Sequence, residues 1–452
     1  MTNRDSISKY EEEKLNFTSK LYVWSVVFES LLFFILVGQE VSVVGGNLSR
    51  MLQFFVLVSL ILKTLMTPYH QIKIFNPSSI YFRWYFVYFS FIIISLIYGI
   101  FTGAFIGKSD NFNSTILRPG FEYFITIYYF LYFAVLPVFL LNSKKGIDYF
   151  FKIFFFMFFL SLFLGAIDYL LYLIIGFEFI PRHLSDMTHV GLRFHGIAGE
   201  PRDAFVHLFF GLCLLFLKEI WDGKRFHRVW VPIIILAALL TQSTSGFIGL
   251  FIALTLILFF QIPRMSFRNI ISFFSIALII SSLVGYSVVN SFRIQLYIDA
   301  APAAFYALES GLDLPPVIMA QIVNIYPVWI RWVEFTEFHL MPLFLGTGLG
   351  TASIINGYVV PAGGVLNPHA NIIRIVFESG VIGTLLFIVA FINPLLKIER
   401  STNIGLVVIL MLLMLGVTFG HRSSTIFTFL GLVIVVNTVL SSYKIKKNAT
   451  AD

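Results

Sequence analysis

The chain has 452 residues, of which 58% are hydrophobic, 17% aromatic and only 12% charged. A soluble domain carries about 25% charged residues, so this sequence cannot cover a water-facing surface. These figures exclude an ordinary soluble enzyme, a disordered protein and a coiled coil. The apolar runs are continuous, which argues against a transmembrane β-barrel. We therefore expect an all-α polytopic membrane protein, because a helix satisfies its own backbone hydrogen bonds in lipid.

The formal net charge of +7 is not evidence for nucleic-acid binding. In a membrane protein such an excess reflects which loops hold Lys and Arg. The one cysteine, Cys213, lies in an apolar run and excludes both a disulfide within the chain and a thiol metal site. No Cys/His metal constellation, Walker motif or HExxH motif occurs, so we expect no metal and no cofactor.

A spanning helix needs about 20 apolar residues, which predicts about 12 spans. The first apolar run ends without a small-x-small cleavage site, so we expect it to remain as a span. The predicted spans are residues 21–38, 51–67, 84–106, 121–142, 149–176, 203–219, 229–242, 246–262, 269–290, 370–392, 403–420 and 423–442.

The spans set the predicted domain organisation. Cytoplasmic tails are expected at 1–20 and 443–452, spans one to nine at 21–290 with an outer loop at 177–202, a large outer loop at 291–369, and spans ten to twelve at 370–442. Loops beyond about 15 residues are usually functional or disordered. The large loop is not disordered in composition. Its segment 317–335 predicts one or two amphipathic helices at the outer interface.

Lys and Arg predict the orientation, because cytoplasmic loops carry an excess of both. With cytoplasmic termini every inner connection is basic. The outer positions are Arg50, Lys108, Arg118, Arg182, Arg193, Arg202, Arg293, Arg331, Arg374 and Arg422. All but one are arginines, whose planar fork binds phosphate or carboxylate through two hydrogen bonds. We interpret this as handling of an anionic ligand; chance and pairing with lipid headgroups are the alternatives.

The first candidate cluster lies at the start of the sixth span. It comprises Arg193, His195, Glu200, Arg202 and Asp203. Pro201 suits a helix N-terminus, where free N–H groups and the helix dipole favour an anion. The alternative is a structural helix cap in which Arg202 pairs with one of the two acids.

The second candidate cluster joins the glycine run 346–350 to the start of the tenth span. Asn371, Arg374 and Glu378 are three and four residues apart, so they share one helix face. Charges within a span usually face a polar cavity; alternatively, the Arg and Glu only neutralise each other. His369 starts this helix, where a histidine can also be a plain polar cap. The glycines do not follow a strand of a βαβ unit, so nucleotide binding is not expected.

Weaker candidates complete the set. Arg331 lies in the large outer loop and Arg422 in the turn between the last two spans. Glu29 and Asp168 lie within spans toward their outer ends, where each lines a cavity or pairs locally.

These motifs resemble the O-antigen ligase and Wzy-type polymerase superfamily over roughly residues 190–395. In that family an Arg precedes a Trp-bearing helix, a Pro-Leu-Phe-Gly-x-Gly-x-Gly loop follows, and His-Asn-x-x-Leu and Glu-x-Gly-x-x-Gly come next. The matching positions here are Arg331, Pro342 to Gly350, His369 to Asn371 and Glu378 to Gly383, with Gly196 to Arg202 resembling an earlier outer-loop segment. Leu345 and Ala370 depart from the pattern, and no Arg follows Ser243 or Ser245, where many members carry Ser-Arg-Gly.

The resemblance implies an integral-membrane glycosyltransferase of the GT-C type at the outer face of the bacterial inner membrane. Its substrates would be undecaprenyl-diphosphate-linked oligosaccharides. A polymerase, which we favour, moves the growing glycan to a sugar hydroxyl of a new lipid-linked repeat unit. A ligase moves it to lipid A–core, and a lipid-linked oligosaccharide transporter is a further alternative. Membrane lipid, a chain-length regulator and a flippase are the expected partners, and nucleic acid is not.

The chemistry assigns expected roles. A diphosphate leaving group needs charge stabilisation, which Arg supplies, and an acceptor hydroxyl benefits from a general base. The expected catalytic residues are His369 and Glu200 as candidate bases, in that order, with Arg202 on the diphosphate. The expected substrate-binding residues are Arg193, Arg331, Asn371, Arg374, Glu378 and Arg422.

Overall fold

The computed structural model is all-helical in the part of the chain that it describes. The described residues are 15–31, 48–66, 79–106, 116–180, 193–198, 201–222, 230–241, 341–354, 371–396 and 424–449, with single positions at 243, 271, 275, 278 and 282. The predicted spans 246–262 and 403–420 and the segment 317–335 lie outside these ranges.

The helices follow one another through the described ranges without a strand. They are α2 (Phe17–Ser30), α4 (Leu48–Met66), α5 (Ser79–Phe101), α6 (Leu117–Tyr129), the π-helix η3 (Phe130–Val135), α7 (Leu136–Leu140), α8 (Lys144–Ile175), α9 (Pro201–Asp222), α10 (Trp230–Leu240), α16 (Met341–Leu345), α18 (Asn371–Leu396) and α20 (Ser424–Ala449). Within these ranges, 7 helices are long and apolar enough to cross a membrane, with α6, η3 and α7 forming one of them. They coincide with predicted spans two to six, ten and twelve, which supports a helical membrane protein.

Most of the described helices begin a few residues before the predicted spans, as α5 does at Ser79 rather than at residue 84. α2 begins at Phe17 rather than at residue 21, because the side chain of Asn16 caps it by accepting a hydrogen bond from the Ser19 N–H (2.7 Å). α10 covers residues 230–240 of the span predicted at 229–242.

Hydrogen bonds between helices show which ends meet. Thr18 Oγ1 and Ser59 Oγ lie 2.7 Å apart, which joins the start of α2 to the later part of α4. Ser19 Oγ donates to the Leu140 carbonyl (2.9 Å), which joins the start of α2 to the end of α7. The start of α2 and the ends of α4 and α7 therefore lie at one end of the bundle.

Two further hydrogen bonds add the starts of α5 and α8 to this end of the bundle. Asn437 Nδ2 donates to Tyr81 Oη (3.2 Å), which joins the later part of α20 to the start of α5. Trp221 Nε1 donates to Asp148 Oδ1 (2.7 Å), which joins the end of α9 to the start of α8. We call this the basic end, from its residues Lys20, Lys63, Arg83, Lys144, Lys145 and Lys218. These helix directions agree with the predicted alternation; assignment of the basic end to the cytoplasm stays a prediction.

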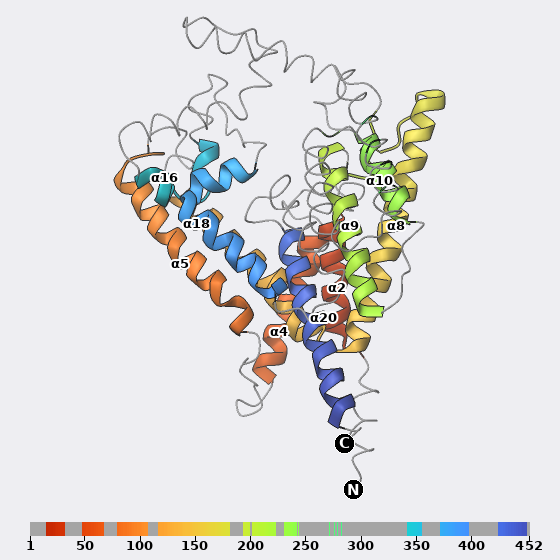
Figure 1. Ribbon diagram of the computed structural model, residues 1–452, viewed down its shortest axis with the longest axis horizontal. Helices are drawn as coiled ribbons and strands as arrows, with labels where there is room; N and C mark the ends of the chain where they lie inside the picture. Colours follow the sequence, from red (N-terminus) through yellow and green to blue (C-terminus); the bar gives the residue numbers. More distant parts are fainter. Residues whose placement is uncertain are drawn as a thin grey trace, which may run out of the picture.

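The helices form two groups that meet toward the basic end. Figure 1 shows α5, α16 and α18 on one side and α8, α9 and α10 on the other, with α2 and α20 between them. Aromatic rings fill the core: Phe150, Phe154 and Phe158 of α8 recur every four residues, are buried and stack ring on ring.

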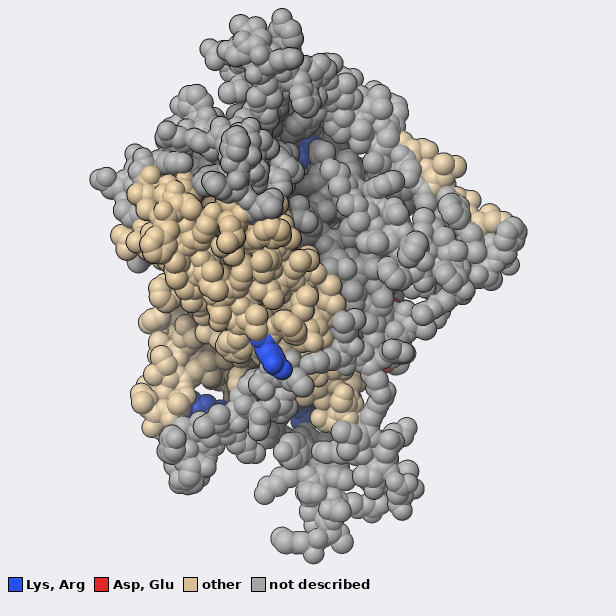
Figure 2. All heavy atoms as spheres, turned by 60° about the vertical axis from the view of Figure 1, so that its left-hand side comes forward, with Lys and Arg blue, Asp and Glu red and all other residues tan. Residues whose placement is uncertain are grey.

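The outer surface is apolar along the helices. Phe86 and Leu170 are more than half exposed in the middle of α5 and near the end of α8. Figure 2 shows Lys and Arg atoms gathered along the lower edge of the described surface, below a region that carries few charged atoms. Such a band is suited to lipid contact, because a soluble monomer rarely exposes so much contiguous apolar surface.

Candidate functional site

The glycine run 346–350 packs against a break in α18. Gly380 has φ 66° and ψ 179°, which interrupts the helix, so the carbonyls before it lose their helical donors. The Thr347 N–H donates to the Phe377 carbonyl (3.2 Å) and the Gly348 N–H donates to the Glu378 carbonyl (2.8 Å). The loop thus supplies the donors that the break removes, which satisfies two buried backbone groups.

Glycine is required where the loop meets the break. Gly346 and Gly380 both have positive φ, and a Cβ on Gly380 would overlap the carbonyl oxygen of Phe344. A Cβ on Gly350 would lie 2.5 Å from Cγ of Glu122, a residue of α6. The small residues therefore let three separate segments, α6, the loop and α18, come into direct contact.

Four charged side chains meet at this contact. Arg374 Nε lies 3.0 Å from Glu378 Oε1, and Arg118 Nε lies 3.3 Å from Glu122 Oε1. Glu122 also acts electrostatically on Arg374, and Glu378 is hydrogen-bonded by the backbone of Gly350. Glu378, Glu122 and Arg374 are all buried. We call these four residues the α6–α18 charge cluster; its charges balance, as burial in a low-dielectric site demands.

One donor of this cluster is not used by its neighbours. Within the described part of the chain, Nη2 of Arg374 has no hydrogen-bond partner, although the residue is only 6% exposed. A buried guanidinium donor without an acceptor is costly. An acceptor for this atom is therefore expected, and none lies among the described residues.

The first predicted cluster is held differently. Arg193 Nε donates to the Thr241 carbonyl (3.0 Å), and the Phe194 N–H donates to the Leu240 carbonyl (2.9 Å). Both contacts satisfy carbonyls at the C-terminus of α10, where a cation also suits the helix dipole. Arg193 thus caps a helix, a contact that the predicted diphosphate role did not include, and this cap is where α10 ends.

His195 of the same segment is next to an acid of α8. Its Nε2 lies 3.2 Å from Asp168 Oδ2, and Asp168 Oδ1 accepts from the backbone N–H groups of Phe179 (2.9 Å) and Ile180 (3.0 Å). Both side chains are buried. Asp168 therefore pairs locally and holds the chain after α8, which is the local alternative that the sequence allowed for it.

The other predicted residues are only partly placed. Glu200, Arg331, His369 and Arg422 lie outside the described residues. Arg202 and Asn371 belong to the first turns of α9 and α18, where only the backbone is described. The structure brings together Arg374, Glu378 and the glycine run, and it adds Arg118 and Glu122. Their spacing of four residues at the start of an apolar run was the sequence signal that could have revealed them.

The described residues include no group of three His, Cys, Asp or Glu side chains that could hold a metal ion. The α6–α18 charge cluster instead offers two arginine–carboxylate pairs beside the backbone N–H groups of the glycine run. No protein-family model matches the chain, and a search of curated proteins finds no similar sequence.

Proposed function

We propose that this protein is a glycan polymerase of the bacterial inner membrane, with a GT-C-type fold of about 12 spans. It would transfer a growing glycan from undecaprenyl diphosphate to a sugar hydroxyl of a lipid-linked repeat unit at the outer face. The observation that carries the proposal is the buried Arg374, whose Nη2 lacks an acceptor among the described residues beside a glycine-rich contact. The sequence resemblance covers the same segments.

The reaction suits the charges of the site. The bond between the sugar anomeric carbon and the diphosphate oxygen breaks, and a bond from that carbon to the acceptor oxygen forms. The leaving diphosphate keeps the electron pair, and the acceptor hydroxyl loses its proton to a base. Arg374 would stabilise the developing negative charge, while Glu378, held by Arg374 and Gly350, keeps the guanidinium oriented. His369 and Glu200 are the proposed candidates for the base.

The test uses the purified full chain in detergent with undecaprenyl-diphosphate-linked repeat units. We expect a ladder of products spaced by one repeat unit. Arg374→Lys keeps the charge but loses the planar fork, and it should slow the ladder by about 100-fold. The matched control is Arg83→Lys, because Arg83 is exposed at the basic end and should retain the wild-type rate.

Two results would overturn the polymerase proposal. One is transfer of the glycan to lipid A–core without a ladder, which identifies a ligase. The other is folded wild-type protein that forms neither product from authentic substrate but moves the lipid-linked oligosaccharide across vesicles, which identifies a transporter.

A further inference from the structure

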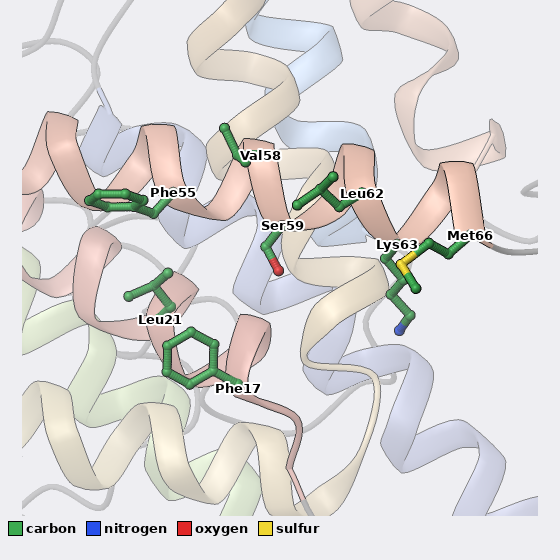
Figure 3. Close-up of a pocket in the computed structure, with 8 residues that line it drawn as sticks. All are labelled: Phe17, Leu21, Phe55, Val58, Ser59, Leu62, Lys63 and Met66. Carbon is green, nitrogen blue, oxygen red and sulfur yellow. The ribbon is translucent and has the colours of Figure 1, made fainter.

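A groove runs between α2 and α4 at the basic end. Its cavity volume is about 640 Å³. The lining residues are Phe17, Leu21, Phe55, Val58, Ser59, Leu62, Lys63 and Met66. Figure 3 shows the α4 residues in a row from Phe55 to Met66, with Phe17 and Leu21 facing them from α2. The small side chain of Ser59 lies in the middle of this row, between bulkier neighbours, which leaves room there.

The walls of the groove favour an apolar occupant. Ser59 and Lys63 are the polar residues among those that line it. Ser59 Oγ lies 2.7 Å from Thr18 Oγ1, so its hydroxyl is engaged by α2 and not directed to a ligand. A hydrocarbon chain would therefore lose no hydrogen bonds by lying along this surface, whereas a polar ligand would find few partners.

The groove is open toward lipid and has the length of one leaflet. Phe17 is 74% exposed and Met66 is 83% exposed, so its rim is apolar as well. From residue 55 to residue 66 a helix rises about 16 Å. Half of a hydrocarbon core of about 30 Å is about 15 Å. An acyl chain that extends from the membrane surface to the bilayer midplane therefore matches the groove.

A positive charge lies at one end of the groove only. Lys63 is in the last turn of α4 and lines the cavity beside Met66. Lys20 follows on the adjacent face of α2, next to Leu21, and its side chain is exposed. Both belong to the basic end, so the phosphate of a lipid whose tail fills the groove would meet these ammonium groups.

We infer that the α2–α4 groove binds an anionic diacyl phospholipid of the leaflet at the basic end. One acyl chain lies along the row from Phe55 to Leu62, and the headgroup phosphate lies at Lys63 with Lys20 nearby. This inference does not depend on the proposed enzymatic activity.

Native mass spectrometry of the full chain tests the inference. The protein is titrated with phosphatidylglycerol and, separately, with phosphatidylcholine carrying the same acyl chains. We expect wild type to bind phosphatidylglycerol about fivefold more tightly, since a Lys near an anionic headgroup contributes about 1 kcal/mol. Lys63→Gln should abolish this preference, while Val58→Trp, which fills the groove, should weaken binding of both lipids. Thermal unfolding of each variant verifies that it is folded.

The control variant is Lys144→Gln, which removes an exposed Lys from the basic end away from the groove. It should bind both lipids as wild type does. Unchanged lipid binding in folded Val58→Trp would overturn the inference. Equal loss of the preference in Lys144→Gln and Lys63→Gln would also overturn it, because the attraction would then be a diffuse property of the basic end.

Discussion

Two arginine–glutamate clusters occupy the same bundle, and they differ in the bonding and exposure of their arginines. The side chain of Arg50 is 36% exposed, and that of Arg374 is 8% exposed. Arg50 of α4 donates to Glu29 Oε1 (3.1 Å), to Gln53 Oε1 (3.3 Å) and to Tyr129 Oη, and lies over the Tyr129 ring. Arg374 of the α6–α18 charge cluster pairs with Glu378, yet its Nη2 has no hydrogen-bond partner in the described ranges. The first arrangement connects three helices, whereas the second leaves Nη2 of Arg374 without a partner among the described residues.

The two clusters also lie at different depths. From residue 17 to residue 29 a helix rises about 18 Å, which places the Glu29–Arg50 cluster about that far from the basic end. From residue 140 back to residue 122 the rise is about 27 Å, which places the α6–α18 charge cluster near the end opposite the basic end. The α6–α18 charge cluster therefore lies farther from the basic end than the Glu29–Arg50 cluster does.

The largest difference in activity between the two clusters is expected when both members of each arginine–glutamate pair are replaced. Arg374→Met with Glu378→Leu replaces a buried ion pair by apolar side chains of similar size, which is often neutral or stabilising for the fold. We expect transfer activity to fall by about 1,000-fold or more, since charge stabilisation of the leaving group is lost. Arg50→Met with Glu29→Leu should keep activity within a few-fold. Product ladders and thermal unfolding check both; equal losses of activity in two folded variants would contradict the distinction.

Removing one partner should instead affect stability. Glu29→Ala leaves buried donors of Ser49 and Gln53 without their acceptor and removes the carboxylate from Arg50, whose side chain is 36% exposed. We expect a loss of about 1–3 kcal/mol in unfolding free energy, the cost of buried polar groups left without a partner. Specific activity of the remaining folded protein should be retained. Glu219→Ala, at a partly exposed position of α9, is the control and should change little. Denaturation in detergent measures both variants, and a stable Glu29→Ala protein would show that this cluster is not structural.

The two arginine–glutamate clusters also differ in their backbone. The α6–α18 charge cluster lies where the glycine run 346–350 packs against the break in α18 at Gly380. Gly380→Ala puts a Cβ at φ 66° and against the Phe344 carbonyl. We expect a loss of about 1–3 kcal/mol from backbone strain, with reduced activity. Gly120→Ala is the matched control, because nothing lies within 4 Å of its added Cβ and it is helical. It should be neutral or slightly stabilising, since Ala favours a helix; comparable losses in both would argue against a role for the break.

The sequence predicts the part of this arrangement that depends on local pattern. Apolar runs identify the spanning helices, and a spacing of four places Arg374 and Glu378 on one face. The approach of Glu122 to Gly350 joins residues far apart in the chain, so no local pattern reports it. Arg50 illustrates the same limit: its contact with Glu29 joins α4 to α2 across 21 positions, and no local pattern reports it. Arg193 gives another example, because its bond to the Thr241 carbonyl at the end of α10 joins residues 48 positions apart.

The variant with the smallest expected effect on stability tests how much an ion pair gains from being buried. Lys218 and Asp222 form an ion pair on α9 with the same spacing of four residues as Arg374 and Glu378, but their side chains are 27% and 31% exposed. Water screens such a pair, so Lys218→Gln should cost only about 0.3–0.5 kcal/mol and leave activity unchanged. Raising the salt concentration should reduce even this difference between wild type and variant, because exposed charges are screened within about 8 Å at physiological ionic strength. If Lys218→Gln were as damaging as the loss of Glu378 from the buried Arg374–Glu378 pair, spacing rather than desolvation would govern these pairs. If the small value holds, burial is what distinguishes the Arg374–Glu378 pair from the Lys218–Asp222 pair of the same spacing.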